Sequence, residues 1–519
     1  MASSAEGSPI DASSTEPAER AQPGEAPVLT PALLARCGRD LAAPFVLRLG
    51  EEANARSLRC EAVLRWLPGR RAVLRVRDER LGVVVAKVYL RDAATAMDAE
   101  RTGLAALAGA GFAVPALLDA SLFEGPGRAE ACGVQCLQLL APARSLAECW
   151  PQLADEARVA HLRELGGGLA RLHAAGARAV DPHLGNFLLH EGSLFALDGG
   201  GIASGRGTVA VHAQCADLAL LHAQLPPDDD VWADATLAAY AQASASTSAG
   251  AAPDLSMLRA AIARARALRV RIILRKSMRD CSEFAVAQDA RQFSTCRRDR
   301  AATLRDVLAD PDAAISAGVV LKAGNTATVA RIDAGDGLRV VCKRYNIKGL
   351  LHRVSRAWRP TRAEHSWCAA QRLAALGIAT AEALALRVER IGPLRGRAFL
   401  FLRDVPGPTL AALADEARTA GSTLAPELQA RVALLLVRLH AAGCVHGDLK
   451  ASNLLLEEGA PVLVDLDALV HLPAGARRDR LQARERARFL ANWPAGAERD
   501  GWTAALAAAA AGWAARGSA

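Results

Sequence analysis

Two short stretches of the chain alternate apolar and polar positions around a single lysine, a pattern typical of β-strands. One is VVVAKVYL around Lys87, and the other is RVVCKRYN around Lys343. Each is followed by a threonine with an acidic residue three positions later, at 95–98 and 361–364. This spacing is typical of a helix N-terminus, because hydroxyl and carboxylate oxygens accept hydrogen bonds from free backbone N–H groups. The pattern therefore predicts a strand followed by a helix, twice in one chain.

The hexapeptide RLHAAG also occurs twice, at residues 171–176 and 438–443. In each copy the histidine precedes an aspartate by eight residues, that aspartate precedes an asparagine by five, and the asparagine precedes a second aspartate by twelve. The residues are His173, Asp181, Asn186 and Asp198 in the first copy and His440, Asp448, Asn453 and Asp465 in the second. Equal spacing of four polar anchors indicates an internal duplication. We expect the hexapeptide to end a helix that leads into a polar loop, with its histidine packed beneath that loop.

Each half of the chain thus contains a strand-rich part, then helices, then a polar loop. We predict an α+β protein of two tandem domains, each with a small strand-rich N-terminal lobe and a helical C-terminal lobe. The predicted boundaries are a disordered tail at 1–38, a first domain at 39–300 and a second domain at 301–519. The small-residue stretch AQASASTSAGAAPD, at 241–254, is predicted to be a loop of the first domain.

Composition narrows the choice of partner and compartment. The net charge of +8 favours an anionic partner: a nucleotide, a nucleic acid, a phosphorylated sugar or an anionic membrane surface. The eleven cysteines are scattered and include no CxxC pair, so we expect reduced thiols, as in the cytoplasm. The sequence has no apolar run of about 18 residues, and its first thirty residues lack the basic and apolar regions of a signal peptide. A cytoplasmic protein without a spanning helix is predicted.

The polar loop of the second half has the residue types that phosphoryl transfer needs. Such a site requires a lysine at the nucleotide phosphates, an aspartate that accepts the proton of the attacking hydroxyl, and an asparagine and a second aspartate on Mg²⁺. HGDLKASN offers Asp448 as the catalytic base, Lys450 for the transferring phosphate and Asn453 for the metal. The apolar strand that follows ends at Asp465, the second metal candidate, and Lys343 is the ATP-binding candidate. This order of motifs is typical of a protein-kinase-like fold.

The first half offers a less complete version of the same set. Lys87 is its candidate for ATP binding, Asp181 for catalysis, and Asn186 and Asp198 for the metal. The loop DPHLGN resembles the DPHPGN loop of the ubiquinone-biosynthesis atypical kinases. However, Ala-Val precedes the aspartate where the second half has His-Gly. An active kinase and a pseudokinase retained for binding or packing are both open hypotheses for this half.

The halves also differ at the expected partner of the strand lysine. Active kinases usually pair that lysine with a glutamate on the next helix. Counting five residues from each predicted capping threonine gives Glu100 in the first half, a candidate for the ATP site, and Ser366 in the second. Glu364 is interpreted as the helix cap, because a residue two positions away lies on another helix face. The phosphates of the second half are also predicted to lie under LKAGNTATVARI, which contains Gly324.

The second half resembles the bacterial lipopolysaccharide kinase family, which includes the Kdo kinases and the inner-core heptose kinases. The resemblance covers about 320–490 and is carried by KRYNIKGLLHRVSRAWRP, SWCAAQRLAALGIATAEALAL, GPLRGRAFLFL and VHGDLKASNLLL. It implies ATP, Mg²⁺ and phosphorylation of a heptose or Kdo hydroxyl on the lipid-linked core, at the cytoplasmic face of the inner membrane. By the family pattern Asp448 is the base and Asp465 a metal ligand. The chain departs from the family at Ser366, where Glu is common, and in its tandem form.

A basic amphipathic segment supports contact with an anionic surface. At 347–358 the sequence IKGLLHRVSRAW places its large apolar residues on one helical side, with lysine and arginines beside them. Such a segment can lie on an anionic bilayer or hold the phosphates of a glycolipid. A helix that packs by its apolar side is the other interpretation. No nucleic acid partner is expected.

Three functions follow from these patterns. The first is an ATP-dependent kinase that phosphorylates a sugar of the lipopolysaccharide core, chiefly through the second half. The second is a tandem pseudokinase that binds nucleotide and scaffolds envelope assembly. The third is a protein Ser/Thr kinase, which shares HGDLKxxN, although HLPAGARRDRLQARERARFL after Asp465 shows no APE-type segment for ordering a peptide.

Overall fold

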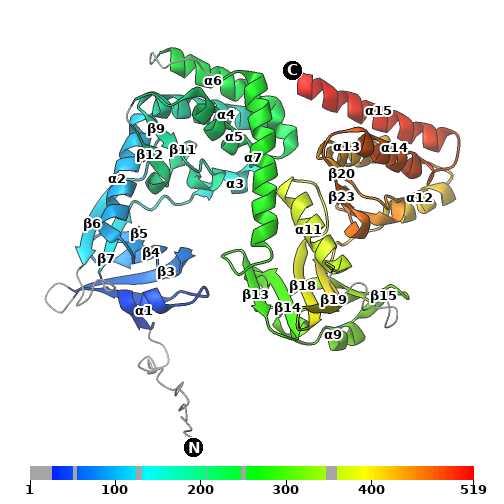
Figure 1. Cartoon of the computed structure of the whole chain (residues 1–519), viewed down its shortest axis with the longest axis horizontal. Coiled ribbons are helices and arrows are strands. Elements are labelled where there is room, and N and C mark those ends of the chain that lie inside the picture. Colours follow the sequence, from blue (N-terminus) through cyan, green and yellow to red (C-terminus); the bar gives the residue numbers. More distant parts are fainter. Residues whose placement is uncertain are drawn as a thin grey trace, which may run out of the picture. The chain divides into compact units, whose positions relative to one another are not determined.

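The computed structural model describes residues 26–50, 55–123, 131–205, 207–246, 253–346 and 359–518 of a mixed α+β protein. The chain forms two compact units, Met1–Asp98 with Pro115–Ala141 and Ala99–Val114 with Pro142–Ala519. Figure 1 shows the elements coloured along the chain. The predicted tail over 1–25, part of the predicted loop (247–252) and the basic segment at 347–358 lie outside the described residues.

The first unit is built on a seven-stranded sheet with the order β1-β2-β3-β4-β5-β7-β6. Its elements are β1 (Val28–Leu29), α1 (Pro31–Arg36), β2 (Phe45–Leu49), β3 (Arg56–Leu67), β4 (Arg71–Asp78), β5 (Gly82–Tyr89), β6 (Leu117–Phe123) and β7 (Cys132–Leu137). The strand predicted around Lys87 is β5, where Lys87 lies opposite Gln135 of β7.

Residues 26–38 fold onto this sheet, so the prediction of a disordered tail is wrong for them. The hydroxyl of Thr30 accepts the amide of Leu33 at 3.3 Å and caps α1, and Pro31 follows at a position where its fixed φ suits a helix start. Leu34 is fully buried in the core of the sheet. Burial of this leucine anchors the segment.

The helical part of the first half follows. α2 (Ala93–Gly109) begins two residues before Thr95, so the predicted cap at 95–98 is wrong and Thr95 lies within the first turn. The further helices are α3 (Leu146–Cys149), α4 (Asp155–Ala174), α5 (Val211–His222), α6 (Ala233–Ala245) and α7 (Leu255–Lys276). Short strands are β8 (Arg144–Ser145), β9 (Ala177–Ala179), β10 (Phe187–His190), β11 (Ser193–Ala196) and β12 (Ile202–Ser204).

A second seven-stranded sheet has the order β13-β14-β18-β19-β17-β16-β15. Its strands are β13 (Phe284–Gln288), β14 (Gln292–Arg297), β15 (Val319–Ala323), β16 (Ala327–Asp333), β17 (Arg339–Tyr345), β18 (Ala383–Ile391) and β19 (Leu394–Arg403). The strand predicted around Lys343 is β17, which lies between β16 and β19.

The pairing of β14 with β18 corrects the predicted boundary at residue 300. Both β13 and β14 precede that residue, yet they extend the sheet of the second half. The long helix α7 leads directly into them (Figure 1). Phe284 and Phe293 from these strands are buried in one core with Trp367. The second half therefore begins after α7.

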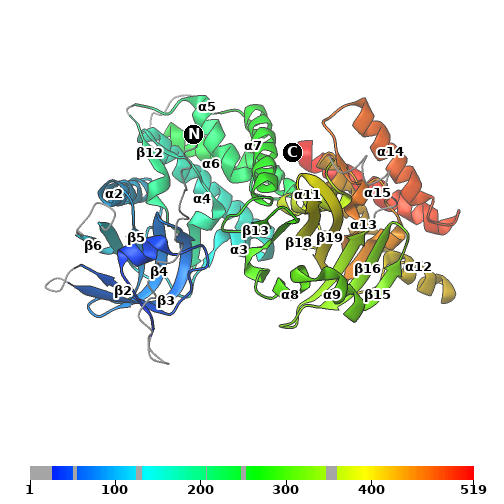
Figure 2. The same cartoon turned by 60° about the horizontal axis from the view of Figure 1, so that its bottom comes forward.

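Helices cover both faces of this second sheet. α8 (Arg305–Ala309) and α9 (Pro311–Ala317) cover one face, where Ile315 packs with Phe401 (Figure 2). α11 (Arg362–Ala375) covers the other face, where Trp367 packs with Leu400. Phe401 and Leu400 are neighbours on β19 and point to opposite faces, as the period of a strand requires.

The helical part of the second half begins with α12 (Leu410–Thr419) and α13 (Pro426–Ala441). The remaining elements are β20 (Cys444–Val445), β21 (Leu454–Glu457), β22 (Ala460–Leu463), β23 (Val470–His471), α14 (Ala476–Leu490) and α15 (Ala497–Ser518). The rings of Trp493 and Trp502 stack with centroids 4.7 Å apart, and Phe489 lies edge-on to Trp502 at 5.1 Å. This aromatic cluster holds α14 to α15.

The two halves share their local construction around the polar loops. α4 and α13 both end inside the hexapeptide, which confirms the prediction that RLHAAG ends a helix. A short antiparallel hairpin follows each loop, β10–β11 in the first half and β21–β22 in the second. The amide of Leu197 donates to the carbonyl of Asn186 at 2.9 Å, and the amide of Val464 donates to the carbonyl of Asn453 at 3.0 Å.

Candidate functional site

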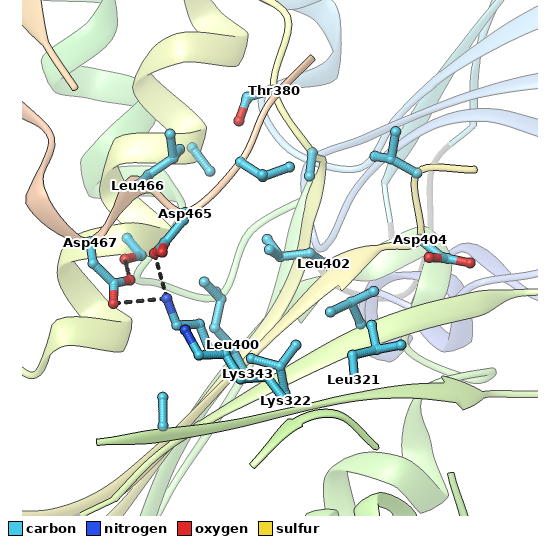
Figure 3. Close-up of a pocket in the computed structure, with 18 of the residues that line it drawn as sticks. Leu321, Lys322, Lys343, Thr380, Leu400, Leu402, Asp404, Asp465, Leu466 and Asp467 are labelled. Carbon is cyan, nitrogen blue, oxygen red and sulfur yellow. Dashed lines mark hydrogen bonds and ion pairs between the residues drawn. The ribbon is translucent and has the colours of Figure 1, made fainter. Parts of the chain in front are cut away.

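In the second half, Lys343 and Asp465 meet although they are far apart in sequence. The Nζ atom of Lys343 donates to Oδ1 of Asp465 at 2.6 Å and to Oδ2 of Asp467 at 2.8 Å (Figure 3). The side chain of Lys343 is 13% exposed, that of Asp465 is 39% exposed and that of Asp467 is 9% exposed. The predicted ATP-binding lysine and the predicted metal aspartate therefore share one partly buried cluster.

The backbone of Asp465 is left-handed, with φ of 60° and ψ of 61°. A residue other than glycine rarely adopts this conformation, at a cost of about 1–3 kcal/mol, and such residues cluster at functional sites. The strain is held on one side by β22 and on the other by the short helix η8 (Leu466–Ala468). The conformation turns the chain sharply where the apolar strand ends.

The loop that carries Asp448 is tied to the segment around Asp465 by two neighbouring residues. His446 is fully buried, and its Nε2 lies 3.0 Å from the carbonyl oxygen of Val464. Gly447 has a φ of 82°, and a Cβ atom there would lie 2.5 Å from the carbonyl oxygen of Ala468. Only glycine fits this close approach. The His-Gly pair therefore joins the two polar segments.

Asp448 lies among basic and amide groups. Its Oδ2 accepts from Lys450 Nζ at 2.9 Å, and Asn453 Nδ2 donates to its backbone carbonyl at 2.9 Å. Arg488 of α14 approaches Oδ1 at 3.6 Å. Burial alone would raise the pKa of Asp448, but the hydrogen bond and charge of Lys450, with help from Arg488, outweigh burial and lower it. Asp448 is thus ionised near neutral pH, as a proton acceptor must be.

A buried carboxylate supports the loop from below. Glu485 of α14 accepts the amide of Gly447 at 2.6 Å through Oε1, and its Oε2 lies 2.9 Å from Nε2 of His440. In the first half the corresponding histidine, His173, contacts Oδ2 of Asp217 at 3.1 Å. Arg178, which comes shortly before the first loop, donates to Asp217 as well. Each hexapeptide histidine therefore pairs with a carboxylate from the helix that follows the loop.

A cavity of about 330 Å³ adjoins Lys343 and Asp465. Its lining is mostly apolar and includes Leu321, Val329, Val341, Leu400, Leu402, Val405, Leu455 and Val464. Gly324 is absent from this lining and sits in the turn between β15 and β16, where its carbonyl accepts from Asn346 at 3.0 Å. The neighbouring Lys322 and Thr326 do line the cavity. An apolar slot that ends in a lysine and a carboxylate suits a flat ring joined to phosphates.

Sequence reasoning missed Asp467, which has more contacts in this cluster than Asp465. Besides Lys343, it accepts from Ser366 and Tyr345 through Oδ1, and from Arg362 through Oδ2, each at 2.6 Å. Burial alone would raise the pKa of Asp467, but Lys343 and the hydroxyl donors outweigh it and the pKa is lowered. The only signal in the sequence was the second acid of Asp-Leu-Asp.

Glu364 does not join the cluster. Its carboxylate accepts the amide of Thr361 at 2.6 Å and pairs with Arg395, and the Thr361 hydroxyl accepts the amide of Glu364 at 3.1 Å. This reciprocal pair is a capping box, as predicted for 361–364. Lys343 thus contacts no carboxylate of α11 among the described residues.

The residues present suit a Mg²⁺ ion held together with phosphates. The side-chain nitrogen of Asn453 donates to the Asp448 carbonyl, which leaves the side-chain oxygen of Asn453 for a metal. The amide of Val464 donates to the backbone carbonyl of Asn453, and the next residue, Asp465, has a partly exposed carboxylate. Mg²⁺ takes oxygen ligands and usually binds through one or two carboxylates plus substrate phosphates and water. Over the described ranges, no group of three His, Cys, Asp or Glu side chains has metal-binding geometry. The side chains present therefore fit a metal ion whose remaining ligands would be phosphate oxygens of a nucleotide and water.

The first half repeats part of this geometry. Asn186 Nδ2 donates to the carbonyl of Asp181 at 3.2 Å, as Asn453 does to Asp448. Asp198 lies between β11 and the short helix Gly199–Gly201. Glu100 of α2 is almost completely buried, and its carboxylate accepts the amides of the first two glycines of that helix at 3.1 and 3.0 Å. Lys87 is buried on β5 of the first unit.

Comparison with known proteins finds a family match for part of the second half. Residues 318–504 match the lipopolysaccharide kinase (Kdo/WaaP) family. A solved structure titled "WaaP in complex with acyl carrier protein" has 20% sequence identity and a TM-score of 0.30, over 40% of this chain and 88% of that one. No curated protein matches the chain. The resemblance drawn from the motifs is thus confirmed over residues 318–504, which are similar to the lipopolysaccharide kinase family.

Proposed function

We propose that the protein is an ATP-dependent kinase that phosphorylates a sugar hydroxyl of the lipopolysaccharide core, with heptose and Kdo as the candidate sugars. The observation that carries this proposal is the contact of Lys343 with Asp465 beside Asp448 and its loop, inside the segment that matches the family. Lysine, base and metal carboxylate are the parts that phosphoryl transfer requires.

Each residue has one task in this proposal. The apolar cavity binds the adenine ring, and Lys343 binds and neutralises the phosphates. Asn453 and Asp465 would hold Mg²⁺, which supplies charge neutralisation on the phosphates when bound. Asp448 accepts the proton of the attacking hydroxyl at its carboxylate. Lys450, already 2.9 Å from that carboxylate, stabilises the negative charge of the phosphoryl group in transfer.

The surface next to Asp448 favours an anionic acceptor. α14 has the sequence ARRDRLQARERARFL, and its residues Arg477, Arg480, Arg484 and Arg488 recur at helical spacing on one exposed side. Arg488 at the end of this row reaches both Asp448 and the carbonyl of Gly447. Among the described residues, no ion pair of Arg480 or Arg484 is found. Carboxylated or phosphorylated core sugars would complement this row.

We also propose that the chain consists of two kinase-like domains, of which the second performs turnover. The repeated hexapeptide, the paired hairpins and the matching asparagine contacts support the duplication. The replacement of His-Gly by Ala-Val in the first half favours the second as the active one, because His446 and Gly447 tie the loop to the metal segment. The first half would then be a pseudokinase.

In this proposal the protein acts at the cytoplasmic face of the inner membrane. The basic segment at 347–358 would contact the anionic membrane surface. The support is chemical, because the acceptor is lipid-linked and the chain is basic. In the part of the chain that the structure describes, no helix is long and apolar enough to cross a bilayer.

Transfer of labelled phosphate from ATP to isolated core glycolipid tests the proposal. Asp448→Asn should lower the rate by about 10²–10⁴-fold, whereas Asp181→Asn should leave it near that of the wild type. Transfer by Asp448→Asn at the wild-type rate would contradict the assignment. Label on a protein instead of the glycolipid would favour a protein kinase, and stabilisation by ATP without turnover would favour the pseudokinase scaffold.

A further inference from the structure

The two halves place a carboxylate differently at one pair of positions, one on a helix and one in the loop after the second polar aspartate. In the first half, α2 provides Glu100, and the residues after Asp198 are glycines whose amides the glutamate accepts. In the second half, α11 provides Ser366, and the residue two positions after Asp465 is Asp467. The Ser366 hydroxyl donates to Asp467 Oδ1 at 2.6 Å. The same pair of positions therefore meets in both halves, with the carboxylate moved from the helix to the loop.

Asp467 is fixed in place by several donors. Lys343 and Arg362 donate to its Oδ2, and the hydroxyls of Tyr345 and Ser366 donate to its Oδ1. Its side chain is only 9% exposed. Four donors on one buried carboxylate leave it a single orientation, because any rotation would strand a buried polar group.

We propose that Asp467 is the residue that positions Lys343 for the nucleotide, in place of the helix glutamate that Ser366 has replaced. The inference rests on the proposed function, since it concerns the same lysine. It also explains how the second half can work without a glutamate at position 366. The carboxylate that holds Lys343, here called the lysine clamp, comes from the loop after Asp465.

The difference in burial between the two aspartates supports this division of labour. Asp465 is 39% exposed and faces the cavity, so it can turn to a metal and the phosphates. Asp467 is buried, and its four donors all come from the protein. Its ion pair with Lys343 can therefore persist when the carboxylate of Asp465 turns from Lys343 to a metal. Separating a buried ion pair is unfavourable, because each charge would lose its partner without gaining water. Lys343 therefore remains extended toward the cavity.

The serine is a necessary companion of this arrangement. Ser366 is 2% exposed. A glutamate there would bring a third carboxylate to Lys343 beside Asp465 and Asp467, and like charges in a buried site repel. A hydroxyl instead donates to Asp467. In the second half the helix residue of this pair donates and the loop residue carries the carboxylate. In the first half the helix residue Glu100 carries the carboxylate and the loop residue Gly200 donates.

The test uses the full chain and four variants: Asp467→Asn, Asp467→Gly, Ser366→Glu, and Ser366→Glu combined with Asp467→Gly. Asp415→Asn is the matched control, because Asp415 is an exposed aspartate that pairs with Arg418. The measurements are the ATP affinity in Mg²⁺, kcat and KM for ATP and for core glycolipid, and the melting temperature. The KM for glycolipid separates a local effect on the nucleotide site from general damage.

We expect Asp467→Asn to weaken ATP binding by about 10- to 100-fold, since that is the usual contribution of a charged hydrogen bond, with kcat lowered and the KM for glycolipid unchanged. Ser366→Glu and Asp467→Gly should each be impaired, and the double variant should recover ATP affinity to within about tenfold of the wild type. The double variant copies the residue pair of the first half, and the melting temperature separates its recovery of ATP affinity from a gain in stability.

The outcomes separate the clamp from the proposed function. Wild-type ATP affinity in Asp467→Asn, or a double variant no better than Asp467→Gly, would overturn the clamp. A wild-type protein that binds ATP but leaves glycolipid unlabelled would overturn the proposed acceptor, while the affinity series would still decide the clamp. A wild-type protein that binds no ATP would overturn both.

Discussion

Glu485 joins His440, near the end of α13, to Gly447 at the start of the second polar loop: one carboxylate oxygen lies 2.9 Å from Nε2 of His440, and the other accepts the amide of Gly447 at 2.6 Å. Its side chain is 3% exposed. The hexapeptide histidine therefore acts on the loop through a carboxylate rather than by packing alone. The first half repeats the histidine–carboxylate contact with His173 and Asp217.

Replacing Glu485 should disturb the loop that carries Asp448. Glu485→Ala strands the Gly447 amide and the His440 imidazole in a buried place, and each unsatisfied group costs about 1–3 kcal/mol. We expect a lower melting temperature and a kcat lowered by at least tenfold, with Glu485→Gln intermediate. Asp217→Ala is the control from the first half and should lower stability without lowering kcat per folded molecule. Equal loss of kcat in both variants would contradict turnover by the second half.

Lys450 should set the acidic limit of activity. Its hydrogen bond and charge help to lower the pKa of Asp448 against the effect of burial. A lowered pKa keeps the base ionised as pH falls, so activity is lost only when pH drops through that lowered value. Lys450→Met removes the charge and raises the pKa of Asp448. The acidic limb of the kcat profile should therefore move to higher pH, together with a fall in the plateau.

An unchanged acidic limb in Lys450→Met, measured with the same glycolipid and saturating ATP, would mean that another group controls it. Lys322→Met is a suitable control, because Lys322 also lines the cavity next to Lys343, and within the described residues no hydrogen bond or ion pair joins it to Asp448. It should alter ATP binding without moving the limb.

The arginine row of α14 should contribute to acceptor binding and not to ATP binding. Arg480→Ala with Arg484→Ala removes two exposed cations one turn apart on the side that leads to Arg488. If the acceptor is anionic, its KM should rise by about tenfold, with a weaker salt dependence, whereas the KM for ATP should stay constant. Arg486→Ala, at another exposed position of the same helix, is the matched control. Parallel changes in both KM values would argue against an acceptor surface.

Gly447 should tolerate no side chain. Gly447→Ala imposes a left-handed φ on alanine and places its Cβ 2.5 Å from the carbonyl oxygen of Ala468. Gly459 has a similar φ of 78°, but a Cβ there meets only the flexible end of Arg431 at 3.6 Å. Both alanine variants should lose about 1–2 kcal/mol to the backbone, and only Gly447→Ala should lose activity as well. Chemical denaturation and kcat measure the two effects separately.

Motif spacing predicted several elements around the candidate site of the second half, because these elements follow from patterns of neighbouring residues. The strand of Lys343, the helix end at RLHAAG and the cap at 361–364 each depend on neighbours within a few residues. Local patterns of this kind are visible in a sequence. The tail was predicted disordered because its composition is polar and small, yet residues 26–38 contain a short capped helix anchored by Leu34.

The features that sequence reasoning missed are set by contacts across long separations. Asp467 lies 124 residues from Lys343, and no spacing rule predicts that this loop aspartate contacts the strand lysine. The residues of β13 and β14 lie before the predicted boundary at residue 300, whereas the pairing of β14 with β18 bridges almost a hundred residues. Hydrogen bonding between strands, not chain order, decides which sheet they join.

The pairing of β14 with β18 has a practical consequence for dissecting the protein. A fragment cut at residue 301 would lose β13 and β14 and leave the N–H and C=O groups of β18 exposed along a whole edge. Such an unprotected edge recruits other chains and promotes aggregation. Insolubility of that fragment would therefore say nothing about whether the second half can fold and work by itself; a fragment that begins near Ser277 retains the two protecting strands.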